Sequence, residues 1–346
     1  MAVLAVVTSS PPGVEGGHLV IARSLVAAAR AQGHDAHLVV TPDYGFGRTF
    51  ATYRGNWSTD VSQVGGRTVD RVISLRYPSY AVRHPSHVCW LNHTMREYYD
   101  LWPTFAASIS ARARLKERVR RSLIHAADWW LLRYRAGRVV AQSRTIQRRL
   151  LEDLGIRADV LWPPPPQRAY RCDAYGDYIL AISRLTPTKR LDLLVRALAE
   201  PAAKHVRVVI AGDGECRGEL AALAATLGVA GRLELTGRLD EDSLTKHLGQ
   251  CRAVCFVPLS EDYGFVTAEA FASGKAVVTC SDSGGPTELV RDGETGFICD
   301  PKPAALAAVL ARVMDDRGLA ERLGRAAAVQ VAGMTWPDAV TRLLMV

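Results

Sequence analysis

Short apolar runs alternate with longer amphipathic stretches along most of the chain. The first run, Ala2 to Val7, is continuously apolar, which is typical of a parallel strand buried on both faces. A loop rich in glycine and proline follows, and an amphipathic stretch from about His18 to Gln32 then predicts a helix that Gly33 ends. The next apolar run, Ala36 to Val40, predicts a second strand, so the chain begins with a β-α-β unit.

The alternation continues through the first half of the chain, with one interruption. The segment from Asp43 to Arg71 is polar, aromatic and rich in glycine, which predicts a loop with little regular structure. Arginine-rich helical sequence later extends to about Tyr134, and Ser143 is placed to cap a helix that ends near Gly155. The further strands predicted in this half are Val72–Leu75, Val88–Leu91 and Arg138–Ala141.

Four consecutive prolines, Pro163 to Pro166, interrupt the pattern, because proline continues neither a helix nor a central strand. The alternation then starts again, with predicted strands at Tyr178–Ile182, Val206–Ala211, Arg232–Thr236, Ala253–Val257 and Ala276–Thr279 and predicted helices at Lys189–Leu198, Glu215–Leu227, Asp242–Leu248 and Thr267–Ser273. We therefore predict an α/β protein with two doubly wound, Rossmann-like domains, residues 1–163 and 164–334. The amphipathic segment 335–346 is predicted to pack back on the first domain.

The charge of the chain favours anionic partners. The length of 346 residues fits two domains, and the formal net charge is +8. Between Arg112 and Arg149, twelve Lys and Arg side chains stand against two acidic ones, so the positive charge is concentrated there. This segment is either a solvated helical face or a patch that contacts an anionic acceptor or the inner face of a membrane. Because no recognition motif accompanies the charge, we expect no nucleic-acid partner.

The seven cysteines are scattered, and none forms a C-x-x-C pair of the kind that binds a metal ion. Several lie in apolar, strand-like runs, which is typical of buried free thiols in a reducing compartment. The apolar N-terminal run is short and lacks a basic start, so we interpret it as a strand rather than a secretory signal. Together with the lack of an apolar run of about 18 residues, these features predict a cytoplasmic protein, with peripheral contact to the inner face of the membrane left open.

The candidate chemistry centres on the stretch Ser260 to Glu269, S-E-D-Y-G-F-V-T-A-E. It joins a predicted strand to a predicted helix and contains a glycine, Gly264, at the helix start. Free backbone N–H groups and the positive end of the helix dipole favour a bound phosphate at such a place. Glu269 lies about 7 Å further along the helix, which suits ribose hydroxyls, and Glu261 on the loop is free to contact the group on the far phosphate. The stretch predicts a nucleoside-diphosphate site.

Three further motifs follow predicted strands, at the edge of the sheet where such folds bind ligands. Arg184 and Lys189 are two cations five residues apart around a turn, which suits a diphosphate and stabilises it as a leaving group. Taken alone, they are also explained, though less well, as a pair of surface charges. The other two motifs are A-G-D-G-E, where Gly212 and Gly214 let the backbone approach a base or ribose, and S-G-G-P-T-E, with Gly284 and Gly285. Taken alone, each of these is also explained by a tight turn.

Together the four motifs resemble the retaining glycosyltransferases of family 4, which have the GT-B fold of two Rossmann-like domains facing each other across a cleft. The resemblance extends from Tyr178 to about Pro301 and rests on the E-x7-E spacing of Glu261 and Glu269, followed by G-K-A-V-V and S-G-G-P-T-E. It implies that the following residues bind the donor: Arg184 and Lys189 the diphosphate, Glu269 the ribose, Glu261 the donor sugar, and Gly264, Phe265 and Val266 the phosphates and sugar through their backbone.

In the first domain the resemblance implies a glycine loop after the first strand, here Gly16 and Gly17, and a histidine near the donor sugar. His93 follows a predicted strand and matches the position of this histidine. The alternative is that His93 only forms a structural hydrogen bond. Two other histidines lie close by and compete for the role, His84 and His87. The residue after His93 is Thr94, where the lipid mannosyltransferases of this family have a glutamate, so the acceptor class stays open.

The resemblance implies a retaining hexosyltransferase that moves a sugar from a UDP- or GDP-sugar to a hydroxyl of a glycan, a glycolipid or a small natural product. Front-face attack, in which the departing phosphate takes the acceptor's proton, fits a site without two opposed carboxylates. The residues predicted to be catalytic are His93, Arg184, Lys189 and Glu261.

We predict that the reaction needs neither a metal ion nor a cofactor, with the nucleotide sugar as co-substrate. A D-x-D motif after a strand is missing from the sequence, and Asp240 to Asp242 is typical of a helix N-cap cluster. Two other classes of function stay open: a nucleotide-sugar epimerase of the same fold, and a non-catalytic protein that binds sugar nucleotides.

Overall fold

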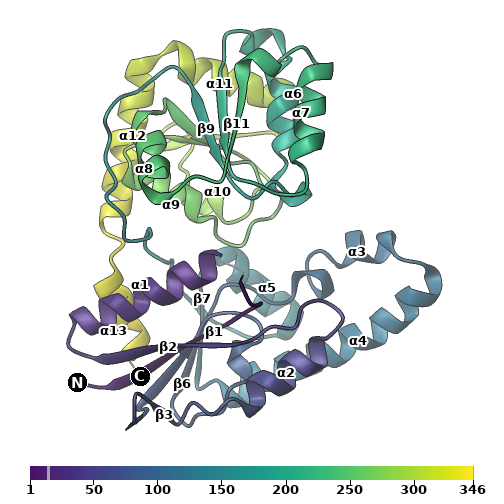
Figure 1. Ribbon diagram of the computed structural model, residues 1–346, viewed down its shortest axis with the longest axis vertical. Coiled ribbons are helices and arrows are strands. Elements are labelled where there is room, and N and C mark those ends of the chain that lie inside the picture. Colours follow the sequence, from purple (N-terminus) through teal and green to yellow (C-terminus); the bar gives the residue numbers. More distant parts are fainter. Residues whose placement is uncertain (14–15, 346) are drawn as a thin grey trace. The chain divides into compact units, whose positions relative to one another are not determined.

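The structure is a computed structural model that describes residues 1–13 and 16–345. The chain divides into two compact units (Figure 1): unit 1 comprises Met1–Pro163 and Thr335–Val346, and unit 2 comprises Pro164–Met334. Each unit contains one six-stranded sheet whose neighbouring strands are parallel. The predicted fold class, two doubly wound Rossmann-like domains, is confirmed.

In unit 1 the strand order is β2-β1-β5-β6-β7-β8. All eight residues of β1 are buried, as its continuous apolar run predicts. The last helix, α13, belongs to this unit, and its Trp336 ring lies 6.2 Å from the Trp90 ring. The strands and helices of unit 1 are β1 (Val3–Ser10), α1 (Gly17–Ala31), β2 (Asp35–Pro42), α2 (Thr49–Ser58), β3 (Gln63–Val64), β4 (Arg67–Thr68), β5 (Arg71–Ser74), β6 (His87–Leu91), α3 (Trp102–Ser108), α4 (Ala111–Trp130), β7 (Arg138–Ala141), α5 (Arg144–Leu154), β8 (Asp159–Val160) and α13 (Trp336–Leu344).

The segment predicted to be irregular, Asp43 to Arg71, contains the helix α2 and the antiparallel hairpin β3–β4. The prediction was wrong because α2 packs through polar side chains, of which Thr49, Thr52 and Asn56 are buried. The Asn56 amide donates to Pro42 O at 2.9 Å and to Thr52 O at 2.8 Å, so its burial is compensated by hydrogen bonds. A helix buried in this way leaves little hydrophobic period in the sequence.

In unit 2 the strand order is β11-β10-β9-β12-β13-β14. The helices pack on a continuous apolar core that includes residues of β9, β10, β12 and β13. The elements β14, α11 and α12 were not predicted from the sequence. The strands and helices of unit 2 are β9 (Ile179–Ile182), α6 (Leu191–Leu198), β10 (Val208–Ala211), α7 (Arg217–Thr226), β11 (Leu233–Gly237), α8 (Glu241–Gln250), β12 (Ala253–Cys255), α9 (Phe265–Ala272), β13 (Val277–Cys280), α10 (Pro286–Leu289), β14 (Gly296–Cys299), α11 (Pro303–Asp315) and α12 (Arg317–Ala332).

The helix α4 reaches away from the sheet of unit 1 (Figure 1). Its buried side chains, Ile124 and Asp128, lie toward its C-terminal end, so the helix is anchored there. Within residues 1–13 and 16–345, no helix combines the length and the apolar character that crossing a bilayer requires.

Candidate functional site

Doubly wound sheets bind ligands at the carboxyl ends of their strands, at the switch point where the order of strand addition reverses. In unit 2 this switch point lies between β9 and β12, which are adjacent and parallel, with Ala253 opposite Ile179. The segment after β9 carries Arg184 and Lys189, and the loop after β12 carries Glu261. The fold therefore brings the two predicted cations and the predicted sugar-binding carboxylate to the same edge of one sheet.

The loop after β12 is joined by backbone hydrogen bonds to the loop after β13. Glu261 N donates to Ser283 O at 2.8 Å, and Gly285 N donates back to Glu261 O at 2.8 Å. A Cβ on Gly284 would lie 2.5 Å from Glu261 O, and one on Gly285 would lie 2.5 Å from Tyr263 Cα. The glycines of the S-G-G-P-T-E motif thus allow the two backbones to touch, which fixes the position of Glu261.

Lys189 and Glu261 form an ion pair at this edge. The Lys189 ammonium donates to Glu261 Oε2 at 2.5 Å, and the two side chains are only 13% and 18% exposed. The ammonium also lies 5.5 Å from the centroid of the Phe256 ring. The prediction that Lys189 opens a helix is wrong, because it ends a 3-10 turn that starts at Pro187, and α6 begins at Leu191. The pair is a preformed unit in which an ammonium suits a phosphate and a carboxylate suits sugar hydroxyls.

Arg190 is a residue of this edge that was not predicted. Its backbone is left-handed, with a φ of 49°, which is uncommon for a residue with a side chain. Its guanidinium donates to Val257 O and to Pro258 O at 2.9 Å each and forms two hydrogen bonds of 2.6 Å with Asp282. Arg190 therefore fastens the turn of Lys189 to the end of β12 and to the loop after β13. Its partners lie 67 to 92 positions away, so local sequence carries no signal for this role.

The A-G-D-G-E motif supports the loop of Arg184. A Cβ on Gly212 would lie 1.8 Å from Ser183 O, and a Cβ on Gly214 would lie 2.5 Å from Leu185 O. The two glycines thus make room for the backbone that flanks Arg184, whose own side chain is exposed. Their predicted approach to a base or ribose stays a prediction.

The helix α9 begins after Gly264, whose backbone is left-handed with a φ of 80°. A Cβ at this position would lie 2.6 Å from the Phe256 ring, so glycine is required on both grounds. Phe265 and Val266 are the first two residues of the helix. Backbone N–H groups of a first helical turn have no acceptor within the helix, which is the arrangement that the predicted phosphate contacts need.

Glu269, the predicted ribose-binding carboxylate, lies on α9 and is 5% exposed. Its Oε1 forms an ion pair with Arg168, which belongs to the segment that follows the four prolines. This contact was not predicted, because the two residues are 101 positions apart.

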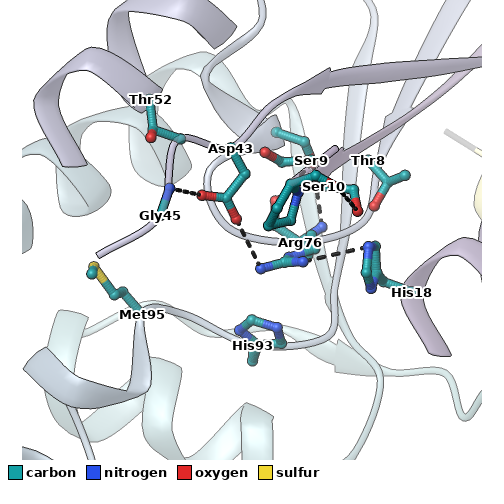
Figure 2. A network of polar contacts seen from close by, with 12 residues as sticks. Thr8, Ser9, Ser10, His18, Asp43, Gly45, Thr52, Arg76, His93 and Met95 are labelled. Carbon is teal, nitrogen blue, oxygen red and sulfur yellow. Dashed lines mark hydrogen bonds and ion pairs between the residues drawn. The ribbon is translucent and has the colours of Figure 1, made fainter. Parts of the chain in front are cut away.

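In unit 1 the switch point lies between β1 and β5. Figure 2 shows the polar groups at this edge, with Asp43 after β2, Arg76 after β5 and His18 in the first turn of α1. Arg76 Nη2 pairs with Asp43 Oδ2 at 3.3 Å, and Arg76 Nη1 lies 3.4 Å from His18 Nε2. These residues were not predicted. The signal that was available is a charged residue directly after a predicted strand, as Arg76 follows Val72–Leu75.

His93 follows β6 and lies near Arg76 (Figure 2). Its Nδ1 donates to Thr94 O at 2.7 Å, which leaves Nε2 as an acceptor. Burial, with a smaller effect of the Arg76 charge, lowers the pKa of His93 to about 3, so the imidazole is neutral near pH 7. His93 is thus suited to accept a hydrogen bond from a hydroxyl group.

The two competing histidines have structural partners. His87, in β6, is 2% exposed and lies 2.8 Å from the Ser74 hydroxyl. His84 lies 2.8 Å from Ser86 O and 3.1 Å from Val69 O. Both precede the carboxyl end of β6, so His93 is the one at the edge where ligands bind.

Gly16 and Gly17 lie where α1 starts. Gly16 has extended backbone, with a φ of −155°, and Gly17 is the first residue of the helix. A Cβ on Gly16 would lie 3.0 Å from His18 Nδ1, so the glycine gives the His18 ring its room. Their contact with a donor stays a prediction.

Comparison with known proteins adds a family to this geometry. A family model described as Glycosyl transferases group 1 matches residues 172–330, which include the loops after β9, β12 and β13. Over these residues the chain is similar to the glycosyl transferases group 1. The predicted resemblance to a GT-B glycosyltransferase is thereby confirmed, and the narrower assignment to family 4 stays a prediction.

Two curated relatives are each similar to more than half of this chain. A D-inositol 3-phosphate glycosyltransferase of Nocardia farcinica is 32% identical over 234 residues, which cover 60% of this chain and 52% of the relative. A GDP-mannose-dependent alpha-(1-6)-phosphatidylinositol monomannoside mannosyltransferase of Mycolicibacterium smegmatis is 33% identical over 197 residues, which cover 53% of this chain and 50% of the relative. The chain thus spans about half the length of these relatives.

A solved structure extends the similarity to the whole fold. Anabaena Alr3699/HepE in complex with UDP and glucose superposes with a TM-score of 0.70 at 16% sequence identity, covering 98% of this chain and 99% of that one. At this identity the likeness concerns the fold, and it agrees with the GT-B class.

Proposed function

We propose that the protein transfers a sugar from a UDP- or GDP-sugar to an acceptor hydroxyl and that the sugar keeps its anomeric configuration. The observation that carries the proposal is the Lys189–Glu261 ion pair at the switch point of unit 2. A nucleoside-diphosphate sugar presents phosphates next to sugar hydroxyls, and the pair presents a cation next to a carboxylate. The GDP-mannose dependence of one relative and the UDP and glucose bound to Anabaena HepE support this class of donor.

In the proposed reaction the donor's diphosphate is the leaving group. The bond between sugar C1 and the phosphate oxygen breaks while the bond from C1 to the acceptor oxygen forms on the same face, and the departing phosphate oxygen takes the acceptor's proton. Arg184, Lys189 and the first turn of α9 stabilise the charge that develops on the diphosphate. The two carboxylates bind hydroxyls: Glu261 those of the donor sugar and Glu269 those of the ribose.

Unit 1 is proposed to bind the acceptor at the edge that carries Asp43, Arg76 and His93 (Figure 2). His93 Nε2 is an unprotonated acceptor near pH 7, since the pKa of His93 is about 3, and it suits a hydroxyl better than an anion. A glycan, a glycolipid and a small molecule all offer such a hydroxyl.

A thermal-shift screen tests the proposed donor class. One of UDP, GDP and ADP, with the sugars attached to it, is expected to raise the melting temperature, because a ligand at about 100 times its Kd stabilises the folded state by about 2.7 kcal/mol. The shift is expected to stay the same with EDTA, since protein cations and a helix N-terminus would neutralise the diphosphate. A melting temperature that no nucleotide raises contradicts the proposal, and a shift that needs magnesium or manganese contradicts its metal independence.

Two other classes of function predict different results when the same protein is incubated with the donor. A nucleotide-sugar epimerase converts its donor to an epimer without any acceptor, which NMR of the incubated donor detects. A non-catalytic sugar-nucleotide-binding protein shows the thermal shift but never consumes a donor. A transferase forms a product only with an acceptor, and the anomeric coupling constant of that product reports whether the configuration is retained.

We also propose that unit 1 contacts an anionic membrane through the 112–149 segment, with α4 as the contacting element. Leu115, Val119 and Leu123 are four residues apart and so share one face of the helix, where they are 67%, 58% and 54% exposed. Trp130 continues the line seven residues further and is 43% exposed. The exposed cations between residues 112 and 135 are Arg112, Lys116, Arg118, Arg133 and Arg135.

The acidic side chains of α4 are turned to protein partners. Glu117 pairs with Arg120 at 2.9 Å, and Asp128 is fully buried. An exposed apolar stripe with exposed cations beside it is the pattern of a helix that lies in the interface of an anionic bilayer. The same cations would repel a second copy of the helix, which disfavours a dimer through this face.

Replacing Leu115 and Leu123 by serine is expected to weaken binding to phosphatidylglycerol-containing vesicles by about 100-fold, because each buried leucine contributes about 1.5 kcal/mol. Flotation with vesicles that contain or lack the anionic lipid measures this. Val329→Ser is the matched control, since Val329 is 77% exposed on α12 of unit 2. A wild-type protein that floats with neither kind of vesicle, or a double variant that floats as well as wild type, contradicts the proposed contact.

A further inference from the structure

The first segment of unit 2, directly after the four prolines, contacts the candidate nucleotide site. Arg168 lies four residues after Pro164, where unit 2 begins, and its Nη1 forms an ion pair with Glu269 Oε1. The Tyr170 hydroxyl lies 3.4 Å from the same oxygen. The Glu269 side chain is 7% exposed and that of Arg168 is 19% exposed, so the two form a mostly buried pair. A carboxylate on α9 is thus held by the first segment of unit 2 rather than by its own helix.

Glu269 needs a cationic partner because its carboxylate is buried. A carboxylate taken out of water loses its hydration and needs a cation or several donors in exchange. Among the described residues, Arg168 is the cation that forms an ion pair with Glu269. The second carboxylate near Arg168 belongs to Glu241 on α8, whose Oε1 lies 3.6 Å from Arg168 Nε. The Glu241 side chain is 63% exposed, so water hydrates its carboxylate and an ion pair contributes little to it. The contact with Glu269 is therefore the one that Arg168 is needed for.

The arrangement assigns different tasks to the two carboxylate oxygens. Within residues 1–13 and 16–345, the side-chain partners of Glu269 contact Oε1, which leaves Oε2 to accept hydrogen bonds from a ligand. A guanidinium fixed on one oxygen also limits rotation of the carboxylate plane. Such a pair presents one oxygen in a defined place, which is what recognition of a hydroxyl requires.

We propose that Arg168 is a positioning residue of the nucleotide site: it fixes Glu269 through Oε1 so that Oε2 accepts hydrogen bonds from the ribose hydroxyls. This role rests on the proposed function, in which Glu269 contacts the ribose. Arg168 itself acts through Glu269 and touches neither the phosphates nor the sugar. Arg168 lies near the start of unit 2, just after the four prolines.

Nucleotide titrations of single variants and of one double variant test the role. Isothermal titration with the nucleoside diphosphate selected from UDP, GDP and ADP is expected to show about 10–100-fold weaker binding to Arg168→Met, the range for one hydrogen bond to a charged group. Arg168→Lys is expected to recover part of the lost affinity, because lysine keeps the positive charge but lacks the planar guanidinium that can form two parallel hydrogen bonds. Arg171→Met is the matched control, since Arg171 lies three residues away, is 55% exposed and pairs with Asp173.

A purely structural role would give other results. Combining Arg168→Met with Glu269→Gln is expected to cost no more than Glu269→Gln alone, because Arg168 acts only through that carboxylate. In steady-state assays the KM for the donor is expected to rise while kcat stays near that of wild type. Circular dichroism melting of each variant establishes whether it is folded. If Arg168→Met does not fold, Arg168→Lys is compared with wild type instead.

Two outcomes overturn the role of Arg168 while leaving the proposed function in place. The first is a variant that binds nucleotide as tightly as wild type or more tightly, which would make Arg168 a bystander or a competitor of the ribose. The second is a loss in the double variant that equals the product of the two single losses. A wild-type protein that binds none of the three nucleotides overturns the proposed function itself, and the role of Arg168 with it.

Discussion

Replacing Lys189 by methionine is expected to slow the release of nucleoside diphosphate from the donor by about 10²–10³-fold, the usual effect of removing one group that stabilises developing charge. Methionine keeps the length of the side chain but removes the ammonium that lies 2.5 Å from Glu261 Oε2. Glu261, which is 18% exposed, would then face the phosphates without its cation. The variant thus loses an attraction for the leaving group and gains a repulsion.

The rate of nucleoside diphosphate release, with the donor that the thermal-shift screen identifies, measures this effect. Arg196→Met is the matched control, because Arg196 is a cation of α6 that is 53% exposed and lies 3.9 Å from Asp192. The control is expected to leave the rate unchanged, since an exposed pair of this kind contributes little. A Lys189→Met variant that works at the wild-type rate would remove Lys189 from the mechanism.

Glu261→Gln separates the two halves of the pair. The glutamine amide still forms hydrogen bonds with sugar hydroxyls, so this variant is expected to lose less activity than Lys189→Met. The two substitutions are expected to be non-additive, because the side chains are in direct contact. Additive losses would mean that the two groups act on separate parts of the donor.

Local signals in the sequence predicted most of the elements correctly. Ser143 accepts a hydrogen bond from Ile146 N at 3.1 Å, as an N-cap of α5 does, and Gly155 ends the same helix in a left-handed conformation with a φ of 64°. Asp240 likewise caps α8 by accepting from Ser243 N at 2.7 Å. Each of these features depends on residues three to twelve positions apart, which is the range over which sequence patterns are informative.

The candidate site was predictable only in part. Lys189 and Glu261 could be placed at one edge because each follows a strand of a parallel sheet, and the carboxyl ends of parallel strands lie at the same edge. The roles of Arg168 and Arg190 depend on pairing with Glu269 and with the ends of β12 and β13, 67 to 101 positions away. Such pairs leave no period and no spacing in the sequence, so they become visible only when the chain is folded.

The second large effect is expected at Asp128, which anchors α4 in unit 1. This fully buried carboxylate accepts hydrogen bonds from Tyr80 at 2.5 Å, from Tyr99 at 2.7 Å and from Tyr53. Asp128→Ala would leave three tyrosine hydroxyls without their acceptor. Since each unsatisfied buried group costs about 1–3 kcal/mol, we expect the unfolding free energy of unit 1 to fall by about 3–5 kcal/mol.

Tryptophan fluorescence during urea unfolding measures this loss in unit 1 alone, because all seven tryptophans of the chain belong to unit 1. Asp128→Asn is the matched control. It keeps the shape of the side chain and the oxygen to which Tyr53 and Tyr80 both donate. The asparagine variant is therefore expected to lose much less stability than the alanine variant, and equal losses would show that the tyrosine contacts do not anchor α4.

The comparison of wild type with Asp128→Asn is also expected to depend on pH. Burial raises the pKa of Asp128 to about 6, from about 4 in an unfolded chain. The folded state then holds this proton more tightly, so the contribution of Asp128 to stability is fully present below pH ~4 and is lost as the pH rises through ~6. Asparagine does not titrate. The stability of the variant relative to wild type should therefore rise by about 2–3 kcal/mol between pH 4 and pH 7. A difference that stays constant over this range would mean that Asp128 keeps its ordinary pKa despite its burial, with the three hydroxyls replacing the water it has lost.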